Sequence, residues 1–450
     1  MKYELYGFFH KTAKTLLKRN NNLPENVKLV SFPNSRFDDG GIRVSGSVIV
    51  NENIFNEVIK QEDVYPVENL VDSSFSMPLS FVGKKVSFSN TKSLSEAKEK
   101  WKKFIESATI PADYRNSGLL YAGFIKEEGN WCLPSWIWTN AAVVRWYCKS
   151  GEIEKAKALG NRIISLQQDC GGWIVRNDYG KEGVSPQLAP NDSCYIALNC
   201  CLKLYEITKD KKYLSSAERC ARWVIETARE DGLVWFAFDT RKQEWIKSRN
   251  IVDTGFTAGL FANLFDLTGK EEYRTFLTSF VKKYIEVFYK KNEKCFSTAI
   301  DGNDIQYGGA FGRGQGWALE GLIPAYKVLK TEEIRTVIKD TIETLLRFQT
   351  DDGGWAYNLF KPLMGEDCKA VPVIANCFID WYEIEKDERL KKAILKALNW
   401  CVKHTATDSI AEGGIFSFTI EGAIVHHMYT NTAFTYGSSY ALEIEHWIKE

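Results

Sequence analysis

The chain has 450 residues, of which 44% are hydrophobic and 13% aromatic, so it can bury a large core and is not a disordered low-complexity protein. Lys and Arg together number 58, as do Asp and Glu, and this balance gives no electrostatic reason to expect binding to nucleic acid or to an anionic membrane. The 11 cysteines lack metal-ligand spacing and no apolar stretch is long enough to cross a bilayer, so we expect a cytoplasmic protein with free buried thiols, no metal and no cofactor.

Residues 1–92 differ in pattern from the rest of the chain. The segment Ile42–Val50 is rich in β-branched residues and partly alternating, and helix signals are weak between residues 21 and 55. We therefore expect residues 1–92 to form an N-terminal extension or small cap of mixed or irregular structure, followed by one large domain over residues 93–450.

From residue 93 onward, the chain shows an internal repeat of helical hairpins. Five short polar turns, the first at Lys149–Glu152, recur at spacings of 55 to 62 residues. A strongly apolar helical pattern such as Thr257–Phe265 precedes each turn, and an amphipathic pattern such as Glu272–Tyr289 follows it. These patterns predict hairpins of one inner and one outer helix over 136–167, 193–229, 254–289, 314–349 and 370–404.

Two further helical segments complete the repeat. Residues 93–108 have the pattern of an outer helix, and residues 432–449 begin like an inner helix. Pairing of the first segment with the last would close twelve helices into a ring. The sequence therefore predicts an all-α fold, an (α/α)6 toroid, with an open solenoid as the alternative.

The longer connections of the repeat all fall at one mouth of the predicted ring, opposite the short turns. They carry Gly, Trp and acidic residues, as in Asp169–Trp173 and Asp351–Trp355. Loops at one mouth of a helical ring are where binding is expected, and aromatic rings there can stack on sugars. Trp136, Trp173 and Trp355 are therefore candidate substrate-binding residues, although large rings at such positions can equally fill the core.

Asp192 and Asp253 stand 61 residues apart, each just before an inner helix. Neighbouring inner helices would bring both carboxylates to the same mouth, where a close pair can have split pKa values and supply a general acid. Asp is also a preferred N-cap residue, so helix capping alone is the alternative explanation of both positions.

The fourth hairpin opens with the glycine-rich segment Gly308–Trp317. Its glycines would let the backbone approach a ligand closely, Arg313 offers a planar donor fork for a carboxylate, and Trp317 offers a flat apolar face. The segment lacks the Lys-Ser/Thr pair of a phosphate-binding P-loop. A tight turn in which Arg313 has a structural role is the alternative.

These residues resemble a known family. The segment Phe311–Trp317 is similar to the aromatic-x-Arg-Gly-Gln/Asn-x-Trp signature of the unsaturated glucuronyl and unsaturated rhamnogalacturonyl hydrolases, glycoside hydrolase families 88 and 105. Val252–Phe256 resembles the Ile-Asp-Thr segment that carries their catalytic Asp, and Asp192 falls where the glucuronyl hydrolases have a second functional Asp. The resemblance covers about residues 95–450 and implies an (α/α)6 barrel.

The resemblance also implies a reaction, the hydration of the C4=C5 enol ether of a Δ4,5-unsaturated uronic acid in an oligosaccharide. An Asp protonates C4, water adds at C5, and the resulting hemiketal opens and releases the aglycone sugar. Carried over to this chain, Asp253 would be general acid and then base and Asp192 would assist. Arg313, Gln315 and Trp317 would line the site.

The sequence departs from the family pattern at three places. Lys294–Asp301 lacks the usual His, Asn191 stands where some members have His, and Tyr436–Glu443 lacks the Asp of the family's closing Gly-Asp-Tyr-Tyr segment. His426 and His427 lie in the last mouth loop and are candidates to replace a lost polar contact with the substrate.

Several functions remain open at this point. Besides a hydrolase of unsaturated uronyl oligosaccharides, the chain could be another (α/α)6 sugar enzyme, such as a uronate epimerase, a lyase or a hydrolase of saturated sugars. It could also be a non-catalytic glycan-binding protein of polysaccharide metabolism. A terpene-cyclase-like toroid is a fourth alternative, because Gln167–Trp173 and Gln349–Trp355 resemble the Gln-x-x-x-Gly-x-Trp repeats of that class. The neutral surface predicts neither assembly nor its absence.

Overall fold

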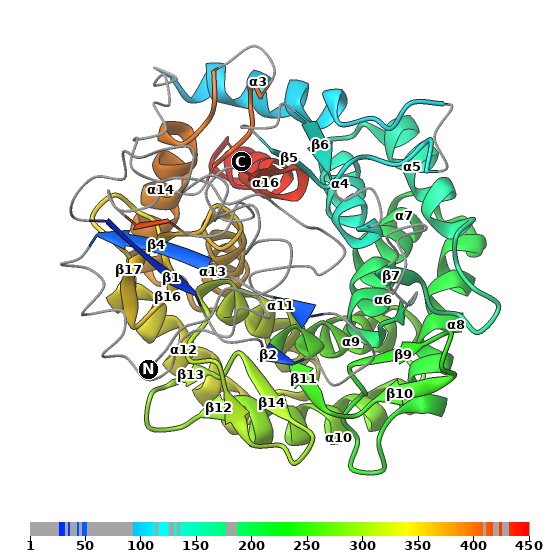
Figure 1. Ribbon diagram of the computed structural model, residues 1–450. Helices are drawn as coiled ribbons and strands as arrows, with labels where there is room; N and C mark the ends of the chain where they lie inside the picture. The colour runs from blue at the N-terminus through cyan, green and yellow to red at the C-terminus, as the bar shows by residue number, and fades with distance from the viewer. Residues whose placement is uncertain are drawn as a thin grey trace.

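The computed structural model describes residues 27–31, 35–36, 43–44, 47–51, 93–112, 116–125, 130–132, 136–176, 187–407, 411–416, 423–424 and 432–449. Over these ranges the chain is mostly helical, and its helices form a ring of two concentric layers (Figure 1). The all-α (α/α)6 toroid predicted from the hairpin repeat is confirmed.

The inner layer of the ring consists of apolar helices that all begin at the same end. Most of their side chains are buried on every side, as the uniformly apolar patterns predicted. Ten of the cysteines are free thiols, and all of these but Cys170 are buried. In chain order, the inner helical runs are α4 (Ile137–Lys149), the continuous run of α6 (Pro190–Ile196), η2 (Ala197–Leu202) and α7 (Lys203–Thr208), α9 (Phe256–Thr268), α11 (Gly312–Leu329), α13 (Val371–Glu385) and α16 (Thr435–Lys449).

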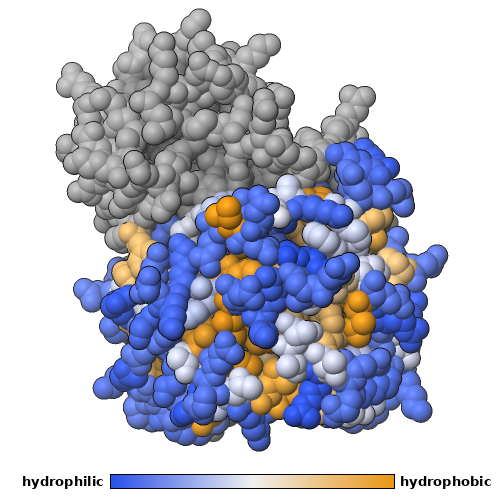
Figure 2. Space-filling model, turned by 90° about the horizontal axis from the view of Figure 1, so that it is seen from below, coloured by the Kyte–Doolittle hydropathy of each residue, from blue (hydrophilic) through white to orange (hydrophobic). Residues whose placement is uncertain are grey.

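The outer layer is amphipathic. Each outer helix buries one apolar stripe against the inner layer and exposes Lys and Glu on the opposite face, so the side wall of the ring is mainly hydrophilic (Figure 2). No helix among the residues described is long and apolar enough to cross a membrane. The outer helices are α3 (Leu94–Ser107), α5 (Ile153–Ile164), α8 (Lys211–Thr227), α10 (Glu271–Phe288), α12 (Glu332–Phe348) and α14 (Glu388–Lys403).

The ring is closed by its first and last helices. Helix α16 packs against both α3 and α4, which lie beside it in Figure 1. Ion pairs support both contacts, with Lys98 Nζ 2.9 Å from Glu445 Oε2 and Arg145 Nε 2.8 Å from Glu443 Oε1. The alternative of an open solenoid is therefore wrong.

We name the two ends of the ring the loop end and the turn end. The inner helices begin at the loop end, where the longer connections from the outer helices arrive. They finish at the turn end, where short turns such as Lys209–Asp210 lead into the outer helices. The parallel inner helices therefore point their amino termini to the loop end and their carboxyl termini to the turn end.

Short β-strands organise the loop-end connections, although the sequence patterns did not predict them. Strands of two or three residues carry no periodic signal, and they form here because another strand supplies the pairing partner. Residues 432–434, predicted as the start of the last helix, form one of them. The loop-end strands are β5 (Gly123–Ile125), β6 (Asn130–Cys132), β7 (Ile174–Arg176), β8 (Gln187–Leu188), β9 (Ala237–Asp239), β10 (Glu244–Ile246), β11 (Arg249–Ile251), β12 (Tyr289–Lys290), β13 (Cys295–Phe296), β14 (Ala299–Asp301), β15 (Gln306–Tyr307), β16 (Ala356–Asn358), β17 (Lys361–Glu366) and β19 (Thr432–Phe434).

The β pattern expected in the N-terminal region is present where that region is described. Strand β4 (Ser47–Asn51) pairs antiparallel with β1 (Val27–Ser31) and with β18 (Ala423–Ile424) from the last loop-end connection. Two shorter strands, β2 (Ser35–Arg36) and β3 (Arg43–Val44), also pair with each other. The division of the chain at residue 92 stays a prediction.

Candidate active site

The amino-terminal ends of the inner helices gather polar side chains at the loop end. Helix α6 carries Asp192, the 3-10 helix η3 (Val252–Gly255) that leads into α9 carries Asp253, and α11 carries Arg313. Helix α11 packs against η3, and η3 packs against α6. The three side chains therefore occupy neighbouring positions on the ring, and each residue is at most 6% exposed.

Neither aspartate is a helix cap, so the capping explanation of their positions is wrong. The N-cap of α6 is Ala189, which places Asp192 inside the first turn, and the N-cap of η3 is Ile251. Neither N-cap residue makes a cap hydrogen bond through its own side chain. Aspartates are seldom this deeply buried, and without a capping role both carboxylates are candidates for chemistry.

The backbone that carries Asp253 is held on both sides. The Val252 N–H donates to the Thr298 carbonyl at 2.9 Å, and the Tyr284 hydroxyl donates to the Val252 carbonyl at 2.7 Å. Burial, reinforced by the Asp253 charge, raises the pKa of Tyr284 well above its usual value, so this hydroxyl stays protonated and remains a donor. These contacts fix the direction from which the Asp253 carboxyl group can act.

The Arg313 guanidinium is fixed between aromatic rings. Its Cζ atom lies 4.6 Å from the ring centroid of Phe311 and 4.5 Å from that of Trp317, and the two rings meet at 85°. The Arg313 charge also interacts electrostatically with the side chain of Tyr436 at the start of α16. A guanidinium fixed in this way is preorganised to bind a planar anion such as a carboxylate.

The glycines around Arg313 allow close helix packing rather than close approach of a ligand. A Cβ atom on Gly314 would lie 2.7 Å from Cγ1 of Val252, and one on Gly312 would lie 2.5 Å from the Ala356 carbonyl oxygen. Both spacings are too short for a side chain. The expected role of these glycines is therefore corrected, because Gly314 brings α11 against η3 and Gly312 brings it against β16.

Gln315, predicted to contact substrate, has a structural task in this fold. Gln315 is fully buried, and its Nε2 donates to the carbonyls of Phe296 at 2.9 Å and Phe311 at 3.0 Å. Its Oε1 accepts from the Phe296 N–H at 2.7 Å. Gln315 therefore ties β13, in the connection that lacks the family's His, to the first turn of α11.

Lys369 is a loop-end residue that sequence reasoning missed. It is fully buried just before α13, where its N–H donates to Asp367 Oδ1 at 2.9 Å. Its Nζ atom lies 4.7 Å from the ring centroid of Phe434, which stacks on Trp136 with centroids 6.0 Å apart. Lys369 thus adds a second buried cation to the region that contains Arg313.

The pKa of Lys369 reflects its burial and its position near Arg313. Burial, followed by repulsion from Arg313, lowers the pKa of Lys369 to about 7, and attraction from Asp367 opposes this effect. A Lys with this pKa exists in both protonation states near neutral pH. A bound anion would favour its charged form, so this corner of the loop end suits an anionic group.

Trp136 and Trp317 border the same region. Trp136 is the N-cap residue of α4, and its ring stacks on Trp138 with centroids 5.7 Å apart. Trp138 packs on Tyr436 at 5.0 Å. The sequence prediction that Trp136 and Trp317 contact substrate stays a prediction, and their location at the loop end is compatible with it.

Trp173 and Trp355 lie inside the wall of the ring, which leaves no ring face for a sugar. Trp355 is fully buried, and its Nε1 donates to the Leu345 carbonyl at 2.8 Å. Gln349 Nε2 donates to the carbonyls of Gly353 at 3.1 Å and Ala393 at 2.9 Å, which ties this loop to the next outer helix. The similarity to terpene-cyclase repeats therefore reflects two loops that use the same Gln and Trp hydrogen bonds to join neighbouring helices. The equivalent bonds of the other loop are Trp173 to Ile163, and Gln167 to Gly171 and Ser216.

His426 and His427 lie outside the described residues. Among the residues that the structure does describe, no group of three His, Cys, Asp or Glu side chains is arranged to hold a metal ion. The loop end thus combines the buried carboxylates of Asp192 and Asp253 with the buried basic groups of Arg313 and Lys369 and with aromatic rings. Such a set can transfer a proton to or from a bound organic anion.

A sequence signal for Lys369 existed. It lies 56 residues after Arg313, which itself lies 60 residues after Asp253, so all three occupy the start of successive inner helices. Reading the hairpin repeat one unit further would have placed Lys369 at the same mouth. The strands and the ring contacts between connections could not have been found in this way, because they depend on tertiary partners.

Comparison with known proteins identifies what this ring resembles. The family model of Glycosyl Hydrolase Family 88 matches residues 134–367, just over half of the chain. No curated protein matches the sequence.

Solved structures share the fold at low sequence identity. An unsaturated glucuronyl hydrolase specific for heparin is 16% identical, with a TM-score of 0.62 over 80% of this chain and 97% of that one. The unsaturated glucuronyl hydrolase of Bacillus sp. GL1, responsible for the degradation of glycosaminoglycan, is 14% identical, with a TM-score of 0.60 over 80% of this chain and 97% of that one. A family 76 α-mannanase of Bacteroides thetaiotaomicron is 12% identical, with a TM-score of 0.59 over 80% and 97%.

Proposed function

Because this chain belongs to glycoside hydrolase family 88, we propose that it hydrolyses oligosaccharides ending in a Δ4,5-unsaturated uronic acid. The observation that carries the proposal is the convergence of Asp192, Asp253, Arg313 and Lys369 at the loop end. The two carboxylates can donate and accept a proton, and the two basic side chains can bind the carboxylate of a uronic acid. The unsaturated glucuronyl hydrolases that share this fold support this class of substrate.

In the proposed reaction, Asp253 donates a proton to C4 of the C4=C5 double bond. The developing positive charge at C5 is shared with the ring oxygen, and water then adds at C5 while its proton returns to the Asp253 carboxylate. The product is a hemiketal, which opens to a ketone at C5 and releases the aglycone sugar from C1. Asp192, on the adjacent helix, would hold a sugar hydroxyl and orient the ring.

Arg313 and Lys369 would bind the C6 carboxylate of the uronic acid. The guanidinium fixed between Phe311 and Trp317 can form two parallel hydrogen bonds to a carboxylate, while the Lys369 ammonium adds a point charge. Because C6 is attached to C5, this anchoring also fixes the double bond relative to Asp253. The buried setting strengthens both interactions compared with bulk water.

Isotope labelling tests the reaction. The purified protein is incubated with an unsaturated uronyl disaccharide in D2O, and the products are analysed by NMR and mass spectrometry. Hydration predicts one deuterium at C4 of the released keto sugar. Release of the aglycone with no deuterium at C4 would contradict the proposal, as would failure to consume unsaturated disaccharides from all the common uronic-acid polymers.

A further inference from the structure

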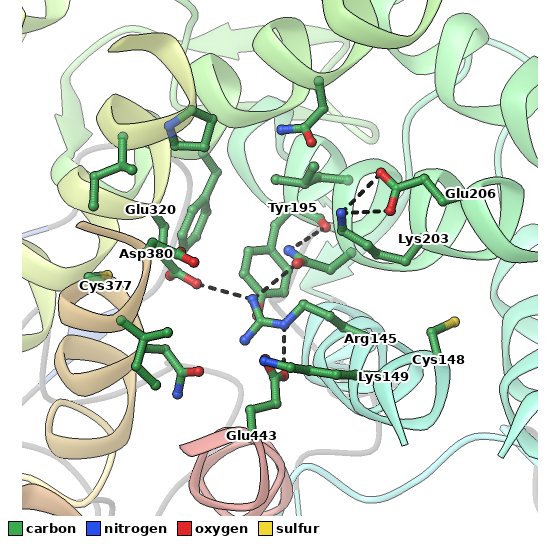
Figure 3. Close-up of a pocket in the computed structure, with 18 of the residues that line it drawn as sticks. Arg145, Cys148, Lys149, Tyr195, Lys203, Glu206, Glu320, Cys377, Asp380 and Glu443 are labelled. Carbon is green, nitrogen blue, oxygen red and sulfur yellow. Dashed lines mark hydrogen bonds and ion pairs between the residues drawn. The ribbon is translucent and has the colours of Figure 1, made fainter. Parts of the chain in front are cut away.

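A second polar cavity lies on the axis of the ring at the turn end, away from the candidate active site. Its volume is about 420 Å³, within the range of about 300–1,000 Å³ typical of small-molecule sites. Each of the inner helices contributes to its lining, and several charged side chains point toward one another across it (Figure 3). Nothing in the proposed reaction uses this cavity.

Arg145 occupies the centre of the cavity wall. Its Nε atom donates to Glu443 Oε1 at 2.8 Å (Figure 3). Its Nη1 atom donates to Asn199 Oδ1 at 3.2 Å and to the Tyr440 hydroxyl at 3.3 Å. The same Nη1 lies 3.5 Å from Glu320 Oε1, which also accepts from Tyr440. Charged groups placed inside apolar helices oppose folding, so the fold retains this network at a cost in stability.

Two backbone irregularities coincide with the cavity. The π-helix η2 interrupts the second inner helical run and presents Leu198 and Asn199 to the cavity. Pro324 lies inside α11 and also lines the cavity, and its missing N–H leaves the Glu320 carbonyl without its helical partner. π-helical turns are frequent at functional sites, and here two independent distortions face one space.

The lining suits a ligand that both donates and accepts hydrogen bonds but carries no net charge. Within the described part of the chain, Arg145 Nη2 and Glu320 Oε2 have no hydrogen-bond partner, and no ion pair or hydrogen bond engages the exposed Asp380. An anion would face the acidic groups, and a cation would face the basic ones. A sugar hydroxyl can donate to a carboxylate and accept from a guanidinium at once. The ionisable lining residues are Arg145, Lys149, Lys203 and Lys327 against Glu206, Glu320, Asp380 and Glu443.

Aromatic rings separate this cavity from the loop end. Tyr195 and Phe256 line its inner limit, with ring centroids 4.7 Å apart. On the loop-end side, Tyr195 packs on Trp138 at 5.7 Å and Phe256 packs on Trp317 at 5.8 Å. The turn-end cavity is therefore a separate space, and its inner rings offer an apolar surface for the C–H face of a sugar.

We propose that the turn-end cavity is a second binding site, for a neutral mono- or disaccharide held by Arg145, Glu320 and Asp380. This proposal goes beyond the reaction at the loop end and does not depend on it. The polar groups would bind hydroxyls at the centre, while Tyr195 and Phe256 would contact the sugar ring.

The test compares pyranoses of the same size and different charge. Binding of glucose, galactose, mannose, xylose and maltose is measured by saturation-transfer NMR and calorimetry, beside glucosamine as a cationic probe and glucuronate as an anionic one. The wild-type protein is compared with Asp380→Trp, in which an exposed side chain grows into the cavity. The matched control is Asp266→Trp, which changes an exposed acid of an inner helix outside the cavity.

We expect at least one neutral sugar to bind the wild type and Asp266→Trp, and Asp380→Trp to weaken this binding about tenfold or more. Should Asp380→Trp fail to fold by circular dichroism, Asn263→Trp closes the same cavity from α9. No binding of any neutral sugar at millimolar concentration would overturn the proposal. So would binding that the cavity-filling variant leaves unchanged, or tighter binding of glucosamine or glucuronate that the same variant removes.

Discussion

The two ends of the ring use charged residues in different ways. At the loop end, Asp192, Asp253, Arg313 and Lys369 stand at the starts of inner helices and are fixed by the connections that arrive there. At the turn end, the charged residues lie within the helices and bind mainly one another, as Arg145 and Glu443 do.

The loop end therefore has the features of a catalytic site, and the turn end has the features of a structural network. At the helix starts, backbone contacts such as the Val252–Thr298 hydrogen bond do the positioning, so the functional side chains can be directed at a substrate. In the helix interiors, the side chains hold one another across the axis, so changing one of them disturbs its neighbours. Substitutions at the loop end should therefore affect turnover, and substitutions at the turn end should first affect stability.

The largest effect is expected for Asp253→Asn. Loss of the proton donor should lower kcat for an unsaturated uronyl disaccharide about 10²- to 10⁴-fold, while the melting temperature changes little because Asp253 is not the N-cap residue of η3 or of α9. The matched control is Asp387→Asn at the true N-cap of α14, where Asn is an equally good cap. Full activity of Asp253→Asn would remove Asp253 from the reaction.

Arg145→Met should have the next largest effect, on stability. It removes one partner of a buried network and leaves Glu443 and Glu320 without their cation, which should lower the free energy of unfolding by about 3 kcal/mol. Urea titration followed by circular dichroism measures the change. An unchanged urea midpoint would contradict the expectation that substitutions at the turn end first affect stability.

Lys369→Met should raise KM about tenfold for an unsaturated uronide and change kcat little, because it removes one of two contacts to the carboxylate. The free energy of unfolding should stay equal or rise, since a buried charge is lost. Lys396→Met, on the exposed face of α14, is the control and should leave KM unchanged. An unchanged KM in Lys369→Met would place the substrate carboxylate elsewhere.

Lys369 also predicts a proton linkage. The pKa of Lys369 without ligand is about 7. Binding of an anion that favours the ammonium form of Lys369 should therefore take up a proton at pH 8. The affinity for the anion should fall as the pH rises above 7. Calorimetry in buffers of different ionisation enthalpy, on Asp253→Asn to prevent turnover, measures the uptake. The uptake should disappear in the Asp253→Asn/Lys369→Met double variant, and its persistence there would assign the proton to another group.

Glu320→Gln should have the smallest effect, visible as a pH dependence of stability. Burial raises the pKa of Glu320 to about 7, against attraction from Arg145 and the Tyr440 hydrogen bond, with Asp380 and Glu443 also facing it. The folded state therefore binds more protons than the unfolded state between its ordinary value of 4.5 and about 7, so wild-type stability falls as pH rises through this window. The stability of Glu320→Gln should fall less steeply with pH than that of the wild type. Identical pH dependences of the two proteins would contradict the assignment of this effect to Glu320.

Much of the ring could be predicted because it repeats. The alternation of apolar and amphipathic helices gave the hairpins to within a few residues, and the spacing of Asp192, Asp253 and Arg313 placed them at one mouth. The short strands escaped prediction because their pairing partners lie in other connections. Trp355 shows a further limit, since sequence cannot tell a ring that faces a mouth from one that fills a wall.

The turn-end network was missed for a different reason. Arg145, Glu320 and Glu443 each interrupt an apolar helical pattern, and such a charge gives no indication of its partner. The partners come from helices that are distant in sequence, and only the closed ring brings them together. A charged residue inside an otherwise apolar inner helix is thus a signal for an axial network in repeats of this kind.

The most direct test of the central claim is the ultraviolet absorbance of the C4=C5 enol ether. Purified protein is mixed with unsaturated disaccharides prepared by polysaccharide lyases from several uronic-acid polymers, with Asp253→Asn as the matched protein. We predict that the absorbance falls for at least one disaccharide with the wild type and stays constant with the variant. Constant absorbance for every disaccharide with the wild type, or an equal fall with the variant, would contradict the assignment of the loop end.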